Sequence, residues 1–113
     1  MPSPFKAYNN GFATLLVGDA TRVIVAAPGA GFRIVVTGYQ WMSVVSAAQI
    51  VTLESSDAAV ILGRFGASVP VGTSGRMDFG RGVALPANTA LRFTPAAAGP
   101  SMFIFVEYFT EPV

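Results

Sequence analysis

Apolar residues in this 113-residue chain recur in short runs and in alternation with polar residues, and no long segment keeps helical spacing. The strand-like segments lie at 12–17, 21–27, 32–44, 49–55, 58–65, 68–72, 76–79, 83–85, 90–94 and 101–110. Between them lie clusters rich in Gly, Pro, Asn, Asp and Ser, at 18–19, 28–31, 55–57, 72–75, 86–89 and 98–100. This spacing predicts an all-β chain, an antiparallel sandwich or barrel of about eight strands.

The segment 42–50 is the best candidate for a helix, but its serines and β-branched residues favour a strand, a loop and a second strand. The short strand at 90–94 alternates cleanly, with Leu91 and Phe93 on its apolar face. Such a strand has one buried and one solvated face. No stretch of the chain therefore predicts a helix.

The last strand-like segment, 101–110, departs from this pattern because both of its faces are apolar. One face carries Met102, Ile104, Val106 and Tyr108. The opposite face carries Phe103, Phe105 and Phe109. Only one face of a strand meets the core in a two-layer sandwich. We therefore predict that these three phenylalanines are covered by the N-terminal arm or by another subunit, and we assign them to an oligomer interface.

The first dozen residues form a different kind of segment, with two prolines in the first four positions and Asn9-Asn10-Gly11 near the end. They predict an extended arm, residues 1–12, ahead of a single β-sandwich domain at 13–113. Four residues of this arm are candidates for contact with a partner: Phe5, Lys6, Tyr8 and Phe12. Such arms gain order when a partner holds them.

Composition changes the picture in one respect, because charged residues make up only 12% of the chain and apolar residues 52%. An ordinary globular domain has about 25% charged residues. So few charges leave much uncharged surface, which favours burial of part of that surface against another chain. Size limits the chain to one domain.

Candidate chemistry is sparse, since the chain has no Cys and no His. Disulfides, thiolate nucleophiles, Cys/His zinc sites and His-based triads are therefore excluded. The motif Gly29-Ala30-Gly31 precedes a β-branched strand rather than a helix, so it predicts a turn and no phosphate site. The six acidic residues show no calcium-loop spacing. We predict a protein that is not an enzyme and that holds no cofactor or metal.

Charge and hydropathy also limit the partners. The net charge of +1 comes without a basic run, which argues against nucleic acid and anionic membranes as partners. The longest apolar runs are five residues, whereas a spanning helix needs about 18 or more. The first residues lack the apolar region of a secretory signal, so we expect the chain to be made in the cytoplasm of its host without a signal peptide.

Two further groups of residues allow a structural or a functional interpretation. The aromatic residues Tyr39, Trp41 and Phe79 form either core packing or an exposed platform for a sugar ring. A glycine-rich stretch holds Arg64, Arg76, Phe79 and Arg81, which form either a solvated loop or a loop that contacts a partner.

The segment Ala26-Ala27-Pro28-Gly29-Ala30-Gly31-Phe32-Arg33-Ile34 and the later stretch from Gly82 to Phe93, closing with Phe105-Val106-Glu107-Tyr108, frame about 80 residues. Together they resemble the small jelly-roll head decoration, or cement, proteins of tailed bacteriophages. The resemblance implies a jelly-roll β-sandwich that assembles as a homotrimer and binds the major capsid protein on the outer capsid surface of the virion.

The expected function is therefore that of a capsid decoration protein, with the arm docking on the capsid. The alternative is a carbohydrate-binding or receptor-binding β-sandwich module of a virion, which would use the aromatic residues Tyr39, Trp41 and Phe79.

Overall fold

The computed structural model describes residues 9–15, 21–45, 50–66, 74–95 and 101–113, and these residues form eight β-strands. The strands are β1 (Asn9–Leu15), β2 (Arg22–Val25), β3 (Phe32–Val45), β4 (Ile50–Ser55), β5 (Ile61–Gly66), β6 (Ser74–Ala84), β7 (Leu91–Pro95) and β8 (Ser101–Pro112). The described ranges contain no helix that could cross a bilayer. The prediction of an all-β fold is confirmed.

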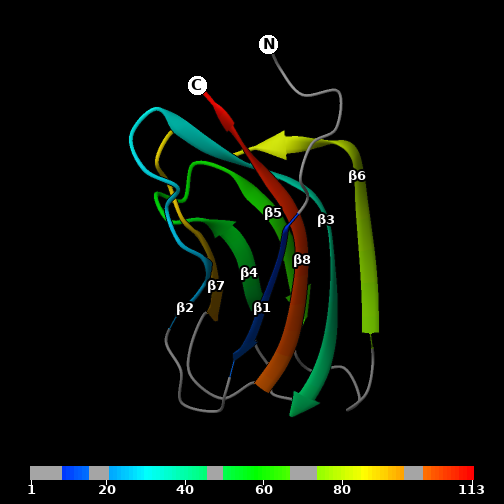
Figure 1. Cartoon of the computed structure of the whole chain (residues 1–113). Helices are drawn as coiled ribbons and strands as arrows, with labels where there is room; N and C mark the ends of the chain where they lie inside the picture. The colour runs from blue at the N-terminus through cyan, green and yellow to red at the C-terminus, as the bar shows by residue number, and fades with distance from the viewer. Residues whose placement is uncertain (1–8, 16–20, 46–49, 67–73, 96–100) are drawn as a thin grey trace.

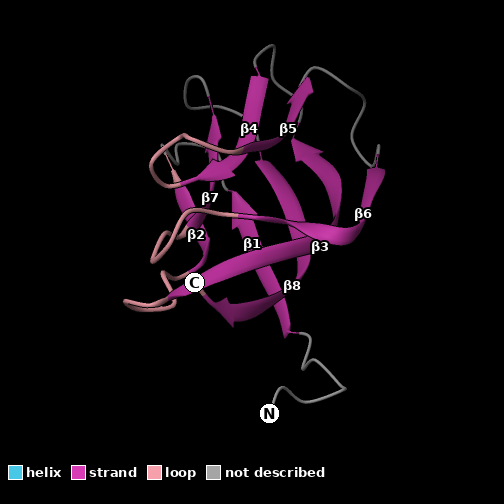
Figure 2. Cartoon of the chain, turned by 90° about the horizontal axis from the view of Figure 1, so that it is seen from above, coloured by secondary structure: helices cyan, strands magenta, loops and turns pink. Residues whose placement is uncertain are grey.

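The strands form two antiparallel sheets, one with the order β1-β8-β3-β6 and one with the order β2-β7-β4-β5. Figure 1 shows the first and last strands side by side, and Figure 2 shows the two sheets as two layers. The ladders are nested, because β4 pairs with β5, β3 with β6, β2 with β7 and β1 with β8. A long hairpin rolled into two sheets gives this order, so the sandwich is a jelly roll.

The core lies between the two sheets and is built from residues that alternate along the strands, as the period of two requires. Its largest fully buried side chains come from both sheets: Phe93, Ile34, Leu53, Leu85, Leu91, Met102, Ile104, Val36, Val51 and Val106. The face of β8 that was predicted to be buried supplies Met102, Ile104 and Val106 to this core. These residues fix which face of the first sheet points away from the core.

A bulge interrupts β3 at Thr37, where the register shifts against both neighbouring strands. On the β6 side the pairing jumps from Val36↔Val83 to Gly38↔Asp78, so residues 79–82 bend out of the ladder. Gly80 and Gly82 have φ angles of +62° and +102° within this bend, a conformation that glycine adopts at little cost. A Cβ on Gly82 would lie 2.5 Å from Val35 Cγ1, so the bend packs closely on β3.

Two sequence-based boundaries differ from the structure. The segments 76–79 and 83–85 belong to one strand, β6, because the bend between them does not end the pairing with β3. The predicted arm of residues 1–12 is too long, since β1 begins at Asn9 and its backbone pairs with β8. Residues 1–8 and the predicted strand at 68–72 lie outside the described residues.

Candidate functional site

The side of the first sheet that points away from the core carries the candidate site. Three neighbouring strands, β8, β3 and β6, place their outward residues in three rows across this surface. The rows are Glu107–Gly38–Asp78, Phe105–Gln40–Arg76 and Phe103–Met42–Ser74. Their neighbours along the strands, Tyr39, Ile104 and Val106, are buried in the core. We call the nine residues of the three rows the outer face.

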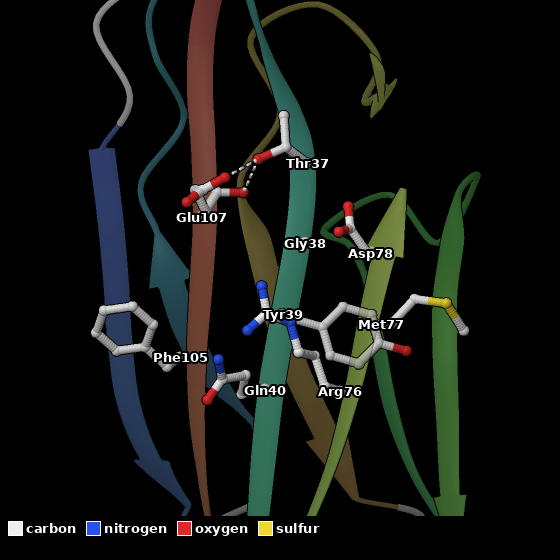
Figure 3. Close-up of a pocket in the computed structure, with 9 residues that line it drawn as sticks. All are labelled: Thr37, Gly38, Tyr39, Gln40, Arg76, Met77, Asp78, Phe105 and Glu107. Carbon is white, nitrogen blue, oxygen red and sulfur yellow. Dashed lines mark hydrogen bonds between the residues drawn. The ribbon is translucent and has the colours of Figure 1, made fainter. Parts of the chain in front are cut away.

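The first row forms the polar end of the outer face. Glu107 and Asp78 lie on either side of Gly38, and a hollow of about 80 Å³ lies between the strands there (Figure 3). The Thr37 hydroxyl lies 2.9 Å from Glu107 Oε1 and 3.1 Å from its backbone carbonyl oxygen. The backbone N–H of Gly80 donates to Asp78 Oδ1 at 3.2 Å. Both carboxylates are thus held in place through one oxygen, and the second oxygen of each remains an available acceptor.

The opposite end of the outer face is apolar. Phe105 is 43% exposed and Met42 39% exposed, and Phe103 beside them is half-buried. A broad depression of about 670 Å³ runs along these residues and reaches Gln40, Ser74 and Arg76. Exposed large apolar side chains that adjoin one another on a sheet favour contact with another protein surface.

Several charges elsewhere in the described residues are paired or capped. Arg33 forms an ion pair with Glu111 at 2.7 Å, and Arg92 approaches Glu54 at 3.6 Å. Asp57 Oδ1 accepts hydrogen bonds from the Ser55 hydroxyl at 2.6 Å and from the Ala59 N–H at 3.0 Å, which lower the pKa of Asp57.

Besides Asp57, the exposed charged residues that make no ion pair within the described part of the chain include Arg64, Arg76, Arg81, Asp78 and Glu107. Three of them, Arg76, Asp78 and Glu107, belong to the outer face. In a chain with only 13 charged groups, this concentration marks the outer face as the surface with charges available for a partner.

The predicted oligomer interface of Phe103, Phe105 and Phe109 divides into two parts. Phe103 and Phe105 lie on the outer face as the alternation requires. Phe109 is only 5% exposed, and Val35, its partner on β3, is 4% exposed. This part of the sheet is therefore covered within the chain itself, and Phe109 is not available to a second subunit.

The proposed sugar platform is not an exposed surface. Tyr39 is 5% exposed in the core, and its hydroxyl lies 3.3 Å from the Leu62 carbonyl oxygen. Its ring lies 5.7 Å from that of Phe79, with the planes tilted by 51°. Trp41 and Phe79 are partly buried against the same core cluster. The interpretation of these aromatics as core packing is correct, because Tyr39 and Trp41 pair with the inward residues Val106 and Ile104.

The predicted partner loop of Arg64, Arg76, Phe79 and Arg81 is not one loop. Arg76, Phe79 and Arg81 belong to β6, whereas Arg64 belongs to β5 in the other sheet. Arg64 pairs with Thr52, which alternates with the buried Val51 and Leu53, so Arg64 lies on the outside of that sheet. The Gly-rich sequence suggested a loop, but antiparallel pairing with β3 holds β6 extended.

The predicted docking arm is only partly described. Its residues Phe5, Lys6 and Tyr8 lie outside the described residues, and Phe12 belongs to β1, where its backbone pairs with that of Phe105. Sequence reasoning missed Gln40, Met42, Asp78 and Glu107 as members of the site. The alternation of Gln40 and Met42 with Tyr39 and Trp41 contained that signal for β3, whereas the bulge at Thr37 had no sequence signature.

Comparisons with known proteins add no relative, since no protein-family model and no curated protein matches the chain. Among the described residues there is no group of three acidic residues that could hold a metal ion. The outer face offers exposed aromatic and aliphatic surface at one end and two oriented carboxylates at the other. This combination can bind a protein surface through apolar burial and ion pairing.

Proposed function

We propose that this chain is a non-enzymatic structural protein of a virion, a capsid decoration protein that binds the outer head surface of a tailed bacteriophage as a homotrimer. The observation that carries the proposal is the outer face, an open sheet face of a jelly roll with Phe105, Met42 and Phe103 at its surface. A jelly roll hosts many functions, so the proposal rests on this surface and on the sequence resemblance rather than on the fold alone.

The size of the apolar contribution favours an assembly with several contacts. Burying a fully exposed Phe or Met is worth roughly 1.5–3 kcal/mol. Phe105 and Met42 are about two-fifths exposed, so covering them contributes about 1 kcal/mol each. Association costs at least about 4 kcal/mol in lost freedom. A closed trimer supports its subunits through three such contacts, and the capsid beneath adds a further surface.

The direct test is binding to heads of the phage whose genome encodes the chain, prepared without this protein. We expect the purified chain to sediment with these heads up to a fixed stoichiometry. We also expect decorated heads to withstand heat better than bare heads. A chain that stays in the supernatant at all concentrations, with bare heads as stable as heads mixed with it, would contradict the proposed function.

A second arm of the test asks whether the outer face is used. The variant Phe105→Glu should bind heads more weakly, because it places a charge in an apolar contact. Val23→Glu is the matched control, since Val23 is 56% exposed and belongs to the other sheet, on edge strand β2. It should bind heads as the parent does. Equal binding by both variants would show that capsid binding does not use the outer face.

A further inference from the structure

A three-fold ring places a specific demand on the outer face. Each contact in such a ring is heterologous, so it joins two different patches of the same chain. If the outer face is one patch, the second patch must lie elsewhere on the subunit and complement its acidic and aromatic groups. A surface of that kind lies on β5.

The second patch consists of Ile61 and Arg64. Ile61 is 46% exposed, and Arg64 is exposed without an ion pair in the described residues. Both lie on β5, the edge strand of the sheet with the order β2-β7-β4-β5. An arginine beside an aliphatic residue is a common composition for an interface core.

Arg76 and Arg81 do not fit this role. Arg76 lies on the outer face itself, one row from the acidic residues. Arg81 follows Gly80 in the bend of β6, on the same strand as Asp78. Both arginines are therefore fixed parts of the acidic patch or its border, whereas Arg64 is carried by a separate sheet. Arg64 is an exposed arginine on a separate sheet, which a neighbouring subunit can bring to the carboxylates.

We propose that, in the trimer of the proposed function, Arg64 of one subunit binds between Asp78 and Glu107 of the next subunit, with Ile61 packed on Phe105. The first row of the outer face suits a guanidinium group. A hollow of about 80 Å³ lies between the two carboxylates beside Gly38, and Thr37 and the Gly80 N–H hold each carboxylate through one oxygen. The aliphatic stem of Arg64 lies along the contact while its charged head reaches the acids.

The test exchanges the charges at positions 64 and 107 and measures the mass of the oligomer. Light scattering and sedimentation give that mass across micromolar concentrations. We expect a trimer for the parent chain. Arg64→Glu and Glu107→Arg should each weaken association by about tenfold or more, because each leaves a like-charge contact. The double variant Arg64→Glu/Glu107→Arg restores an opposite-charge pair and should associate within about threefold of the parent. Thermal unfolding of each variant shows that it is folded.

Arg22→Glu is the matched control, since it makes the same charge change on an exposed arginine outside both patches, on β2 at the opposite edge of the sheet from β5. It should leave the association constant within about threefold of the parent. The proposal is overturned if Arg64→Glu and Arg22→Glu weaken association equally, if the double variant associates no better than the single variants, or if the parent is monomeric. Head binding is measured separately, so a chain that decorates heads through another contact disproves the Arg64 contact and leaves the proposed function standing.

Discussion

Among the described residues, Asn88 and Ala58 are the two residues other than glycine with left-handed backbone conformations, and they are supported in different ways. Asn88 has a φ angle of 48°, and its side-chain oxygen accepts a hydrogen bond from the Gly29 N–H at 2.9 Å. Asparagine tolerates this conformation. Ala58 has a φ angle of 61° in the turn after β4, where its N–H donates to the Ser55 carbonyl oxygen at 2.8 Å. The Cβ of alanine is strained there, whereas glycine would not be.

We therefore expect Ala58→Gly to raise the free energy of unfolding by about 0.5–1 kcal/mol. Relief of the left-handed strain exceeds the greater entropy of glycine in the unfolded chain. Urea denaturation measures this difference. Ala59→Gly is the control, because Ala59 has no left-handed φ angle. This variant should lower the free energy of unfolding by about 0.5–1 kcal/mol. A lower midpoint for Ala58→Gly would show that the turn is unstrained.

Two side chains contribute to the pH dependence of the free energy of unfolding. Hydrogen bonds from Ser55 and Ala59 lower the pKa of Asp57, and burial raises the pKa of Tyr39. The Asp57 contribution is present above the unfolded value near about 3.9 and is lost as the pH falls through the folded pKa. The Tyr39 contribution is present below about 10 and is lost as the pH rises through its folded pKa.

With no His or Cys in the chain, we expect a melting temperature that is nearly constant between about pH 5 and pH 9 and falls outside that range. Differential scanning calorimetry from acid to alkaline pH measures this profile. Asp57→Asn should reduce the fall in melting temperature at acid pH. Tyr39→Phe should reduce the fall at alkaline pH. A melting temperature that changes by many degrees between pH 5 and pH 9 would disprove the expectation.

At the scale of elements, the period-two pattern was sufficient to place most strands and the buried face of β8, since burial follows alternation directly. The pattern could not reveal the bulge at Thr37, because an extra backbone residue leaves no mark in hydrophobicity. The pattern also could not reveal that the Phe109 side chain is buried, because that burial depends on tertiary contacts. It also allowed Tyr39 to be read as exposed, although pairing with Val106 turns that ring inward.

The bend of β6 permits a test of close packing between elements. Gly82 and Gly29 have similar φ angles, +102° and +105°, but a Cβ on Gly82 would lie 2.5 Å from Val35 Cγ1, and one on Gly29 would meet no atom within 4 Å. We expect Gly29→Ala to cost about 1–2 kcal/mol from backbone strain alone. Gly82→Ala should cost about 1–3 kcal/mol more because it also overpacks the bend against β3.

Chemical denaturation of the two glycine variants measures both effects, and the difference between them isolates the contact with Val35. Equal losses would mean that the bend moves away from β3 without cost. A smaller loss for Gly82→Ala than for Gly29→Ala would contradict the close approach altogether.

For the whole molecule, the outer face and the low charge content together predict self-association. We expect Phe105→Glu to convert the assembly to monomers at micromolar concentration, since it introduces a charge that the contact must desolvate. The core variant Ile104→Val should cost about 0.5–1.5 kcal/mol of stability and leave the assembly unchanged. Light scattering reads the mass of each variant. A parent chain with the mass of one subunit, and a Phe105→Glu variant that behaves in the same way, would contradict self-association.

The nesting of the ladders sets the order in which the chain can be completed during synthesis. β8 lies between β1 and β3 in the first sheet, so β1 has no strand to pair with in that sheet until β8 has been made. At ribosomal speeds of about 5–20 residues per second, roughly 5–20 s separate β1 from β8. During that interval β4 can pair with β5, then β3 with β6, and then β7 with β4 and β2. The nascent chain therefore closes from its middle outward, and the assembly contacts on the outer face become available only after β8 has been made.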